Sequence, residues 1–367
     1  MIFWARATVI RERNSWSHAA EYDVELEDGT IGRALAYIPI VGHPQPHQSV
    51  LLTSAAIAKG LGTGGHYMIA AIPDDLPTEN AEPGHIVKAR YTPTQYMTMG
   101  VDEQESPYHE ILRQADSIEG MPVIVADLHS AVAPAVLAAR ARTSDLRIAY
   151  VMDDGGALPA WYSQAADGLT RAGLILGTIS CGQAFGGDME AVNIHTGLLA
   201  ARLVWHADIA VVAPGPGNLG TDTRWGFSGT QVGNTINAVN TLHGHAIALL
   251  RASSADERPR HRGISHHTRT ALQSVALTPA LLPAPAHSGD VLCAGVSQQV
   301  WSLFERELSA LTLTDRLHRI DVETEGLSEA FSTSPIPLST MGRSPDDDPL
   351  AFLCAGVAGY AAVDLIA

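Results

Sequence analysis

The stretch that decides the fold is MPVIVADLHSAVAPAVLAARARTSDLRIAYVMDDGG, residues 121–156. It begins with an apolar run of strand length, continues through an alanine-rich helical segment at residues 133–142, and returns to a second apolar run at residues 146–152. Strands that are apolar along their whole length are buried on both faces, as in a parallel sheet covered by helices. The stretch therefore predicts a strand–helix–strand unit of an α/β protein.

The same alternation continues along the chain. Three further apolar runs and two helical stretches alternate, at residues 174–188, 191–204, 207–220, 230–244 and 245–252. We therefore predict a mostly parallel, Rossmann-like, three-layer α/β domain over residues 103–285. The pattern does not reveal the order of the strands in the sheet.

The first hundred residues have a different pattern. Five short β-prone runs are separated by turn signals, at residues 5–13, 20–29, 31–40, 49–56 and 66–72. Asp28-Gly29 is a hairpin signal because both residues tolerate positive φ, and GLGTGG at residues 60–65 is a second glycine turn. We predict a small β-barrel over residues 1–102.

Residues 286–367 are predicted to form a C-terminal helical segment packed on the α/β domain. The stretch LLPAPAHSGD, residues 281–290, is interpreted as the connection that leads to it. An amphipathic helix is expected over residues 296–311. A terminal helix is expected after the aspartates at residues 346–348, whose charges are favourable beside a helix N-terminus.

Composition limits the classes of function. Among 367 residues, 46% are hydrophobic and 17% charged, which is typical of a folded globular protein. The net charge of −16 argues against a nucleic-acid or anionic-membrane partner, since both require clustered cations. Three distant cysteines make a disulfide framework or a cysteine zinc site improbable. Arg6 interrupts the N-terminal apolar run, and Asp364 interrupts the last one, so we expect a cytoplasmic protein without a membrane span.

The glycine-rich loop PGPGNLGTDTRWGFSG follows an apolar run and precedes a helical stretch. Its exposed backbone N–H groups are suited to an anion. The letters G-x-G-x-x-G match a dinucleotide fingerprint, but the prolines around the first glycine and the missing acidic residue disfavour a nicotinamide cofactor. The alternative is a tight turn under a domain contact. The ligand-binding candidates in this loop are Gly215, Gly217, Asn218, Gly220, Thr221 and Arg224.

The segment DERPRHRGISHHTRTAL, residues 256–272, concentrates arginine and histidine in an acidic chain. Ser265 is a suitable N-cap, which places His266 and His267 in the first turn of a helix. There the helix dipole favours a neutral imidazole, fit for metal ligation or proton transfer. The alternatives are surface ion pairs for the arginines and a partly solvated histidine pair. His267 is a catalytic candidate, and Arg262 and His266 are ligand-binding candidates.

Acidic residues follow three other predicted strands. Asp153 and Asp154 stand before two glycines, and Asp188 follows AFGG, so both places could supply a general acid or base or hold a divalent metal such as Mg²⁺. A helix cap is the alternative for the first pair. Asp127 lies in ADLHS, where Ser130 lacks the G-x-S-x-G context of a hydrolase nucleophile. Asp153 and Asp188 are the catalytic candidates.

Eight segments of the chain resemble a bacterial family known only as domain of unknown function 3866. They are LGTGGHYMIAA, GHIVKARYTP, ESPYHEIL, MDDGGALP, GQAFGGDMEAVN, APGPGNLGTDTRWGFSGTQVG, RPRHRGISHHTRTAL and LSTMGR. The resemblance covers nearly the whole chain but implies no activity and no catalytic residues. Asn218 is a departure, since an apolar residue is expected there.

Two functions from different classes remain open. One is an enzyme that acts on a small anionic substrate, a phosphate or a carboxylate, by metal-assisted or acid–base chemistry, with hydrolysis or phosphoryl transfer as the reaction. The other is a non-catalytic ligand-binding or assembly protein, since the barrel and the apolar terminal helix suit subunit contacts in a homo-oligomer. The enzyme hypothesis requires Gly217, Asp153, Asp188 and His267 to meet at one electropositive spot.

Overall fold

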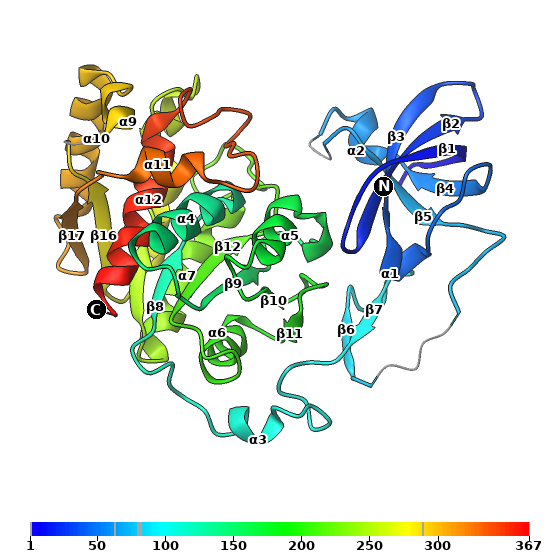
Figure 1. Cartoon of the computed structure of the whole chain (residues 1–367), viewed down its shortest axis with the longest axis horizontal. Helices are drawn as coiled ribbons and strands as arrows, with labels where there is room; N and C mark the ends of the chain where they lie inside the picture. The colour runs from blue at the N-terminus through cyan, green and yellow to red at the C-terminus, as the bar shows by residue number, and fades with distance from the viewer. Residues whose placement is uncertain (1, 62–63, 79–82, 288–289, 367) are drawn as a thin grey trace. The chain divides into compact units, whose positions relative to one another are not determined.

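The computed structural model describes residues 2–61, 64–78, 83–287 and 290–366. Its contacts divide the chain into two compact units, Met1–Glu82 and Pro83–Ala367 (Figure 1). The division falls at residue 82, whereas the sequence pattern predicted a boundary at residue 102. Residues 86–98 form a hairpin, β6 (Ile86–Lys88) and β7 (Tyr96–Thr98), which belongs to the second unit. Among the described residues, no helix combines the length and apolarity needed to cross a bilayer.

The first unit is a closed five-stranded barrel of order β1-β2-β3-β5-β4, as predicted. Its elements are β1 (Trp4–Trp16), β2 (Ala19–Leu26), β3 (Ile31–Tyr37), α1 (Ile38–Val41), β4 (Ser49–Thr53), α2 (Ala55–Ala58) and β5 (Tyr67–Ala71). Alternate apolar side chains such as Val9, Tyr22 and Val50 fill its interior. The Asp28-Gly29 turn is also confirmed, because Gly29 has φ +81° and Asp28 accepts a hydrogen bond from the Thr30 N–H. Residues 62–63 of the second glycine turn lie outside the described residues.

The second unit is built on an eight-stranded sheet of order β11-β10-β9-β12-β8-β13-β16-β17, in which every neighbouring pair is parallel. The strands are β8 (Pro122–Val125), β9 (Ile148–Asp153), β10 (Thr178–Cys181), β11 (Met189–Ala191), β12 (Ile209–Pro214), β13 (His245–Ala248), β16 (Ala280–Pro285) and β17 (Leu317–Val322). The α/β class is confirmed. Because β12 lies between β9 and β8, the order differs from the 3-2-1-4-5-6 of dinucleotide-binding folds.

Helices cover both faces of this sheet (Figure 1). They are α3 (His109–Leu112), α4 (Val132–Arg142), α5 (Gln164–Arg171), α6 (Ile194–Leu203), α7 (Gln231–Thr241), α8 (His266–Thr270), α9 (Val291–Ala294), α10 (Gln298–Leu311), α11 (Leu327–Ser332) and α12 (Pro349–Asp364). Successive strand residues point to opposite faces, so Ile124 packs with α4 and α5, while Val123 and Val125 pack with α6 and α7. The terminal helix α12 is buried against α4 and β16, as expected for an apolar helix.

The prediction that residues 281–290 are a connection is wrong, because residues 280–285 form strand β16. Prolines lack the N–H that a central strand donates. Here the N–H groups of Ala280 and Ala286 donate to the backbone oxygens of Arg316 and Val322, on the β17 side. Successive residues of a strand direct their backbone N–H to opposite sides, so the odd-numbered positions, Pro283 and Pro285, face the β13 side. On that side the pairing ends at Leu281, and no ladder hydrogen bond is lost. The sheet also continues beyond the predicted domain end at residue 285, because β17 (Leu317–Val322) pairs with β16.

Candidate functional site

A cleft of about 730 Å³ lies at the carboxyl ends of the central strands. Three segments line most of it: residues 128–130 after β8, residues 216–222 after β12, and several residues between Arg251 and His267 after β13. In an open parallel sheet, ligands bind at this edge because loops and helix starts converge there. The position of the cleft is therefore that of a ligand site.

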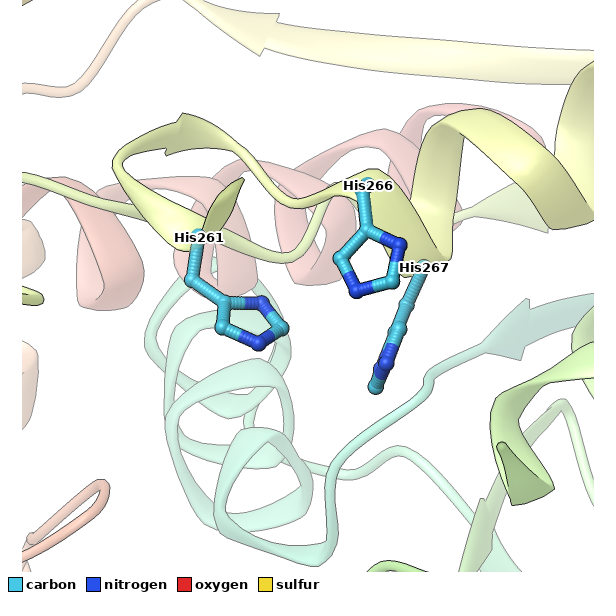
Figure 2. A group of neighbouring side chains, drawn as sticks. All are labelled: His261, His266 and His267. Carbon is cyan, nitrogen blue, oxygen red and sulfur yellow. The ribbon is translucent and has the colours of Figure 1, made fainter. Parts of the chain in front are cut away.

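Three histidines gather on one wall of the cleft. His261, His266 and His267 each offer one ring nitrogen, and these three atoms all lie within 4.8 Å of one another. Figure 2 shows His266 and His267 at the start of α8 and His261 on the segment before it. The ring centroids are 4.3–5.1 Å apart. This spacing suits three ligands of one metal ion.

The backbone between the histidines explains why they meet. Ser265 caps α8 through the His267 N–H, as predicted, and its hydroxyl lies 2.8 Å from Nδ1 of His261. Gly263 makes the turn that brings the chain back, with φ +69°. A Cβ there would lie 2.5 Å from a carboxylate oxygen of Glu307, so only glycine fits. The three histidines of the sequence H-x₄-H-H therefore meet because of the Ser265 cap and the Gly263 turn.

Two of these histidines, His261 and His266, are held in the uncharged form. Burial, and then the charges of Arg251 and Arg258, lower the pKa of His261 to about 3. Burial also lowers the pKa of His266, and its Nε2 is buried without a hydrogen-bond partner. His267 stacks on Phe227 with ring centroids 3.9 Å apart and an interplanar angle of 3°. Neutral imidazoles are the form that binds metal ions.

Asp127 connects the loops around the cleft. The residue is 3% exposed, and its carboxylate accepts a hydrogen bond of 2.7 Å from Nη1 of Arg251. The same oxygen lies 3.5 Å from Nδ1 of His267. Asn218 donates from Nδ2 to the backbone oxygen of Asp127, which ties the glycine loop to the end of β8. A histidine that binds a metal ion through one ring nitrogen commonly donates the N–H of its other ring nitrogen to a carboxylate.

The charge of the cleft is balanced. Arg251 pairs with Asp127, Arg258 pairs with Asp256, and Arg260 pairs with Asp222. The three arginines that line the cleft therefore do not make the electropositive spot that the sequence predicted. A bound divalent cation would supply the missing positive charge.

The structure brings some of the predicted residues together. Six of them line the cleft: Gly217, Asn218, Gly220, Thr221, His266 and His267. Gly215, Arg224 and Arg262 do not. Gly215 packs against Met152 and Leu158, Arg224 lies over the ring of Trp225 at 5.2 Å, and Arg262 is exposed.

Asp188 is far from this cleft, because it stands at the amino end of the sheet. Its carboxylate accepts a hydrogen bond from the N–H of Thr178, the first residue of β10. Asp188 follows β10 along the chain, as expected, but it directly precedes the short strand β11 and therefore lies at the amino end of the sheet. A shared site of Asp188 with His267 is therefore not formed.

The family of the chain is identified by its sequence profile. The profile of a family described as protein of unknown function, DUF3866, matches residues 33–359. The chain belongs to this family. No curated protein and no solved structure matches it. The description of the family assigns no activity to it.

His261 and Arg251 line the cleft but are not among the site residues predicted from the sequence. His261 stands five residues before the histidine pair, a spacing that no regular helix or strand brings together. His129 lines the cleft, and burial lowers its pKa to about 4. Its ring lies 2.7 Å from the hydroxyl of Ser163 and 3.1 Å from that of Tyr150. Only the local sequence DLHS, at a strand end, could have indicated it.

Asp153 ends β9 at the same edge as the cleft but does not line it. The residue is 6% exposed, and its Oδ1 has no hydrogen-bond partner. Burial, and then the charges of Asp127 and Asp154, raise the pKa of Asp153 to about 7. Asp154 has a structural role, since it accepts hydrogen bonds from the N–H groups of Ala157 and Gln183.

The raised pKa of Asp153 predicts a pH-dependent stability. An aspartate in an unfolded chain has a pKa of about 3.9, so between about pH 4 and pH 7 only the native state keeps the proton. Stability is therefore lost as pH rises through this window, by up to about 1.4 kcal/mol per pH unit. In Asp153→Asn this contribution should vanish, as urea unfolding at pH 5 and pH 7 would show. Asp74→Asn, on the exposed barrel surface, is the control; a pH response in Asp153→Asn equal to the control's would contradict the prediction.

Proposed function

We propose that the chain is an enzyme that binds a transition-metal ion through His261, His266 and His267 and uses it on a small anionic substrate in the cleft. Hydrolysis or phosphoryl transfer is the proposed reaction. The observation that supports this most is the meeting of three imidazoles, from two segments, at the wall of a large cleft.

The donor set favours Zn²⁺ or a similar ion over Mg²⁺. Imidazole nitrogens suit zinc, copper, nickel and iron, whereas Mg²⁺ prefers oxygen ligands. Asp153 and Asp188 are the oxygen ligands considered from the sequence. They lie at opposite ends of the sheet, Asp153 at the carboxyl ends of the strands and Asp188 at the amino ends. Three protein ligands leave a fourth position of zinc for water, whose pKa the ion lowers to about 7.

The surroundings of His267 fit the role of a ligand. When Nε2 binds a cation, the ring proton stays on Nδ1 and needs an acceptor. Asp127 Oδ2, at 3.5 Å from Nδ1, is that acceptor. Nη1 of Arg251 now lies 2.9 Å from the same Nδ1, so metal binding requires Arg251 to turn toward Asp127 alone. Because Asp127 then balances the charge of Arg251, the metal ion itself supplies the positive charge that attracts an anionic substrate.

The cleft also offers contacts for the substrate anion. Arg260 and Asp222 form an exposed pair, with side chains 39% and 69% exposed. Exposed pairs contribute little stability, so Arg260 can exchange Asp222 for a substrate phosphate or carboxylate at small cost. Gly217, with φ +110°, keeps the loop backbone open to a ligand, since nothing lies within 4 Å of its missing Cβ.

Metal binding should raise the thermal stability of the metal-free protein. At free Zn²⁺ of 100 times Kd, a ligand stabilises the folded state by about 2.7 kcal/mol. That corresponds to roughly 5–10 °C in Tm. The Zn²⁺-loaded protein should then hydrolyse at least one of p-nitrophenyl phosphate, a phosphodiester and a carboxylic ester, and a chelator should abolish the reaction. The absence of any Zn²⁺ effect on Tm would overturn the proposal.

A non-catalytic ligand-binding protein is the second candidate. The pairing of every cleft arginine with a carboxylate favours it, because no cation in the described part of the cleft wall is left unpaired for a substrate. Metal binding without turnover of any substrate in the panel would support this candidate over the enzyme.

A further inference from the structure

A second, smaller cavity of about 40 Å³ adjoins the cleft. The two cavities share five lining residues, which are Leu128, Ser130, Arg251, His261 and Met341. The small cavity therefore opens beside a histidine of the proposed metal site. It extends from there toward α4 and α12.

The polar groups of the small cavity already satisfy one another. Asp348 accepts hydrogen bonds from Arg343, Ser253 and Ser254. Asp256 pairs with Arg258 and with Arg343. A charged or strongly polar ligand group would have to break these pairs and leave a buried charge without its partner, which is costly.

Much of the remaining cavity wall is apolar. This part includes Pro134 on α4, Leu249 and Ala252 after β13, and Ala351, Phe352 and Ala355 on α12. Most of these side chains are buried in the two cores, so the wall is rigid. A small aliphatic group would fill this space without disturbing the ion pairs.

The volume limits the group to a short aliphatic chain. A water molecule needs about 10–15 Å³ of cavity volume, so a cavity of about 40 Å³ has room for only a few non-hydrogen atoms. We infer that the small cavity is a specificity pocket for a short aliphatic end of the substrate. This inference rests on the proposed function, because the polar end of the same molecule is placed on the metal ion.

Simple carboxylates test the pocket. Formate, acetate, propionate, butyrate and valerate are titrated into the Co²⁺-loaded protein, and their affinities are read from the visible spectrum of the ion. Affinity should rise about fourfold per carbon from formate to propionate, because each added carbon is buried in the pocket. It should rise no further from butyrate to valerate.

Two variants should move this limit in opposite directions. Ala351→Leu reduces the pocket at a half-buried position, so the gain from formate to propionate should disappear. Leu249→Ala enlarges it, so the gain should continue to valerate. Ala294→Leu, at an exposed position of α9 outside both cavity walls, is the matched control and should behave as the unsubstituted protein.

The outcomes separate this inference from the proposed function. If Co²⁺ binds and the five acids bind equally, or if Ala351→Leu leaves their order unchanged, the pocket assignment is wrong while the metal site stands. If Co²⁺ shows no ligand-field spectrum with the protein, the proposed function fails and the pocket assignment fails with it.

Discussion

In a metal titration of the His266→Ala variant, the affinity for Zn²⁺ is expected to fall by more than about 100-fold. Loss of a group that is hydrogen-bonded to a metal ligand already lowers the metal affinity by about 10–100-fold, and loss of the ligand itself lowers it further. Because Nε2 of His266 has no hydrogen-bond partner in the protein, its removal should leave the fold intact. Isothermal titration of the metal-free protein with Zn²⁺, together with circular dichroism, measures both effects.

His195→Ala is a closely matched control. His195 also stands in the first turn of a helix after a capping residue, since Asn193 caps α6 as Ser265 caps α8. It is exposed and does not line the cleft. Equal affinity of His266→Ala and the unsubstituted protein would show that the three histidines do not bind the ion together, and an equal loss in His195→Ala would show that the effect is not specific.

The parts of the fold that the sequence predicted are those set by local patterns. Runs such as residues 121–125 and 209–213 are apolar throughout, and this alone places a strand inside a covered parallel sheet. β16 was missed because Pro283 and Pro285 resemble a linker. A strand tolerates these prolines only if they face a side where no neighbouring strand needs their N–H groups. Which side that is depends on the order of the strands in the sheet, which the sequence does not show.

The site was predictable only where one segment contains it. Ser265, His266 and His267 are adjacent, so their cap and helix turn could be read directly. Asp188 was misplaced because AFGGD resembles the end of a strand, whereas its carboxylate returns to the start of β10. The contacts of Asp127 with Arg251 and Asn218 span 124 and 91 residues, and no local pattern encodes them.

Replacing Lys88 should be among the most destabilising single changes in the second unit. Its ammonium group is fully buried and lies 3.2 Å from a carboxylate oxygen of Glu190. It also donates hydrogen bonds to the backbone oxygens of Gly182 and Ala184, at 2.6 and 3.0 Å. Lys88→Met leaves these acceptors and a buried carboxylate without a cation, which costs about 3–5 kcal/mol. Urea unfolding of the variant measures the loss.

The chain contains its own control, because its only other lysine is the exposed Lys59 on the barrel. Lys59→Met should change stability by less than about 0.5 kcal/mol. The double variant Lys88→Met/Glu190→Gln should be more stable than Lys88→Met, since it removes the stranded charge. Burial raises the pKa of Glu190, and the Lys88 ammonium opposes that effect. Hence the loss in Lys88→Met should be smaller at pH 5 than at pH 8, where the carboxylate is charged; equal losses at both pH values would contradict an electrostatic role for Lys88.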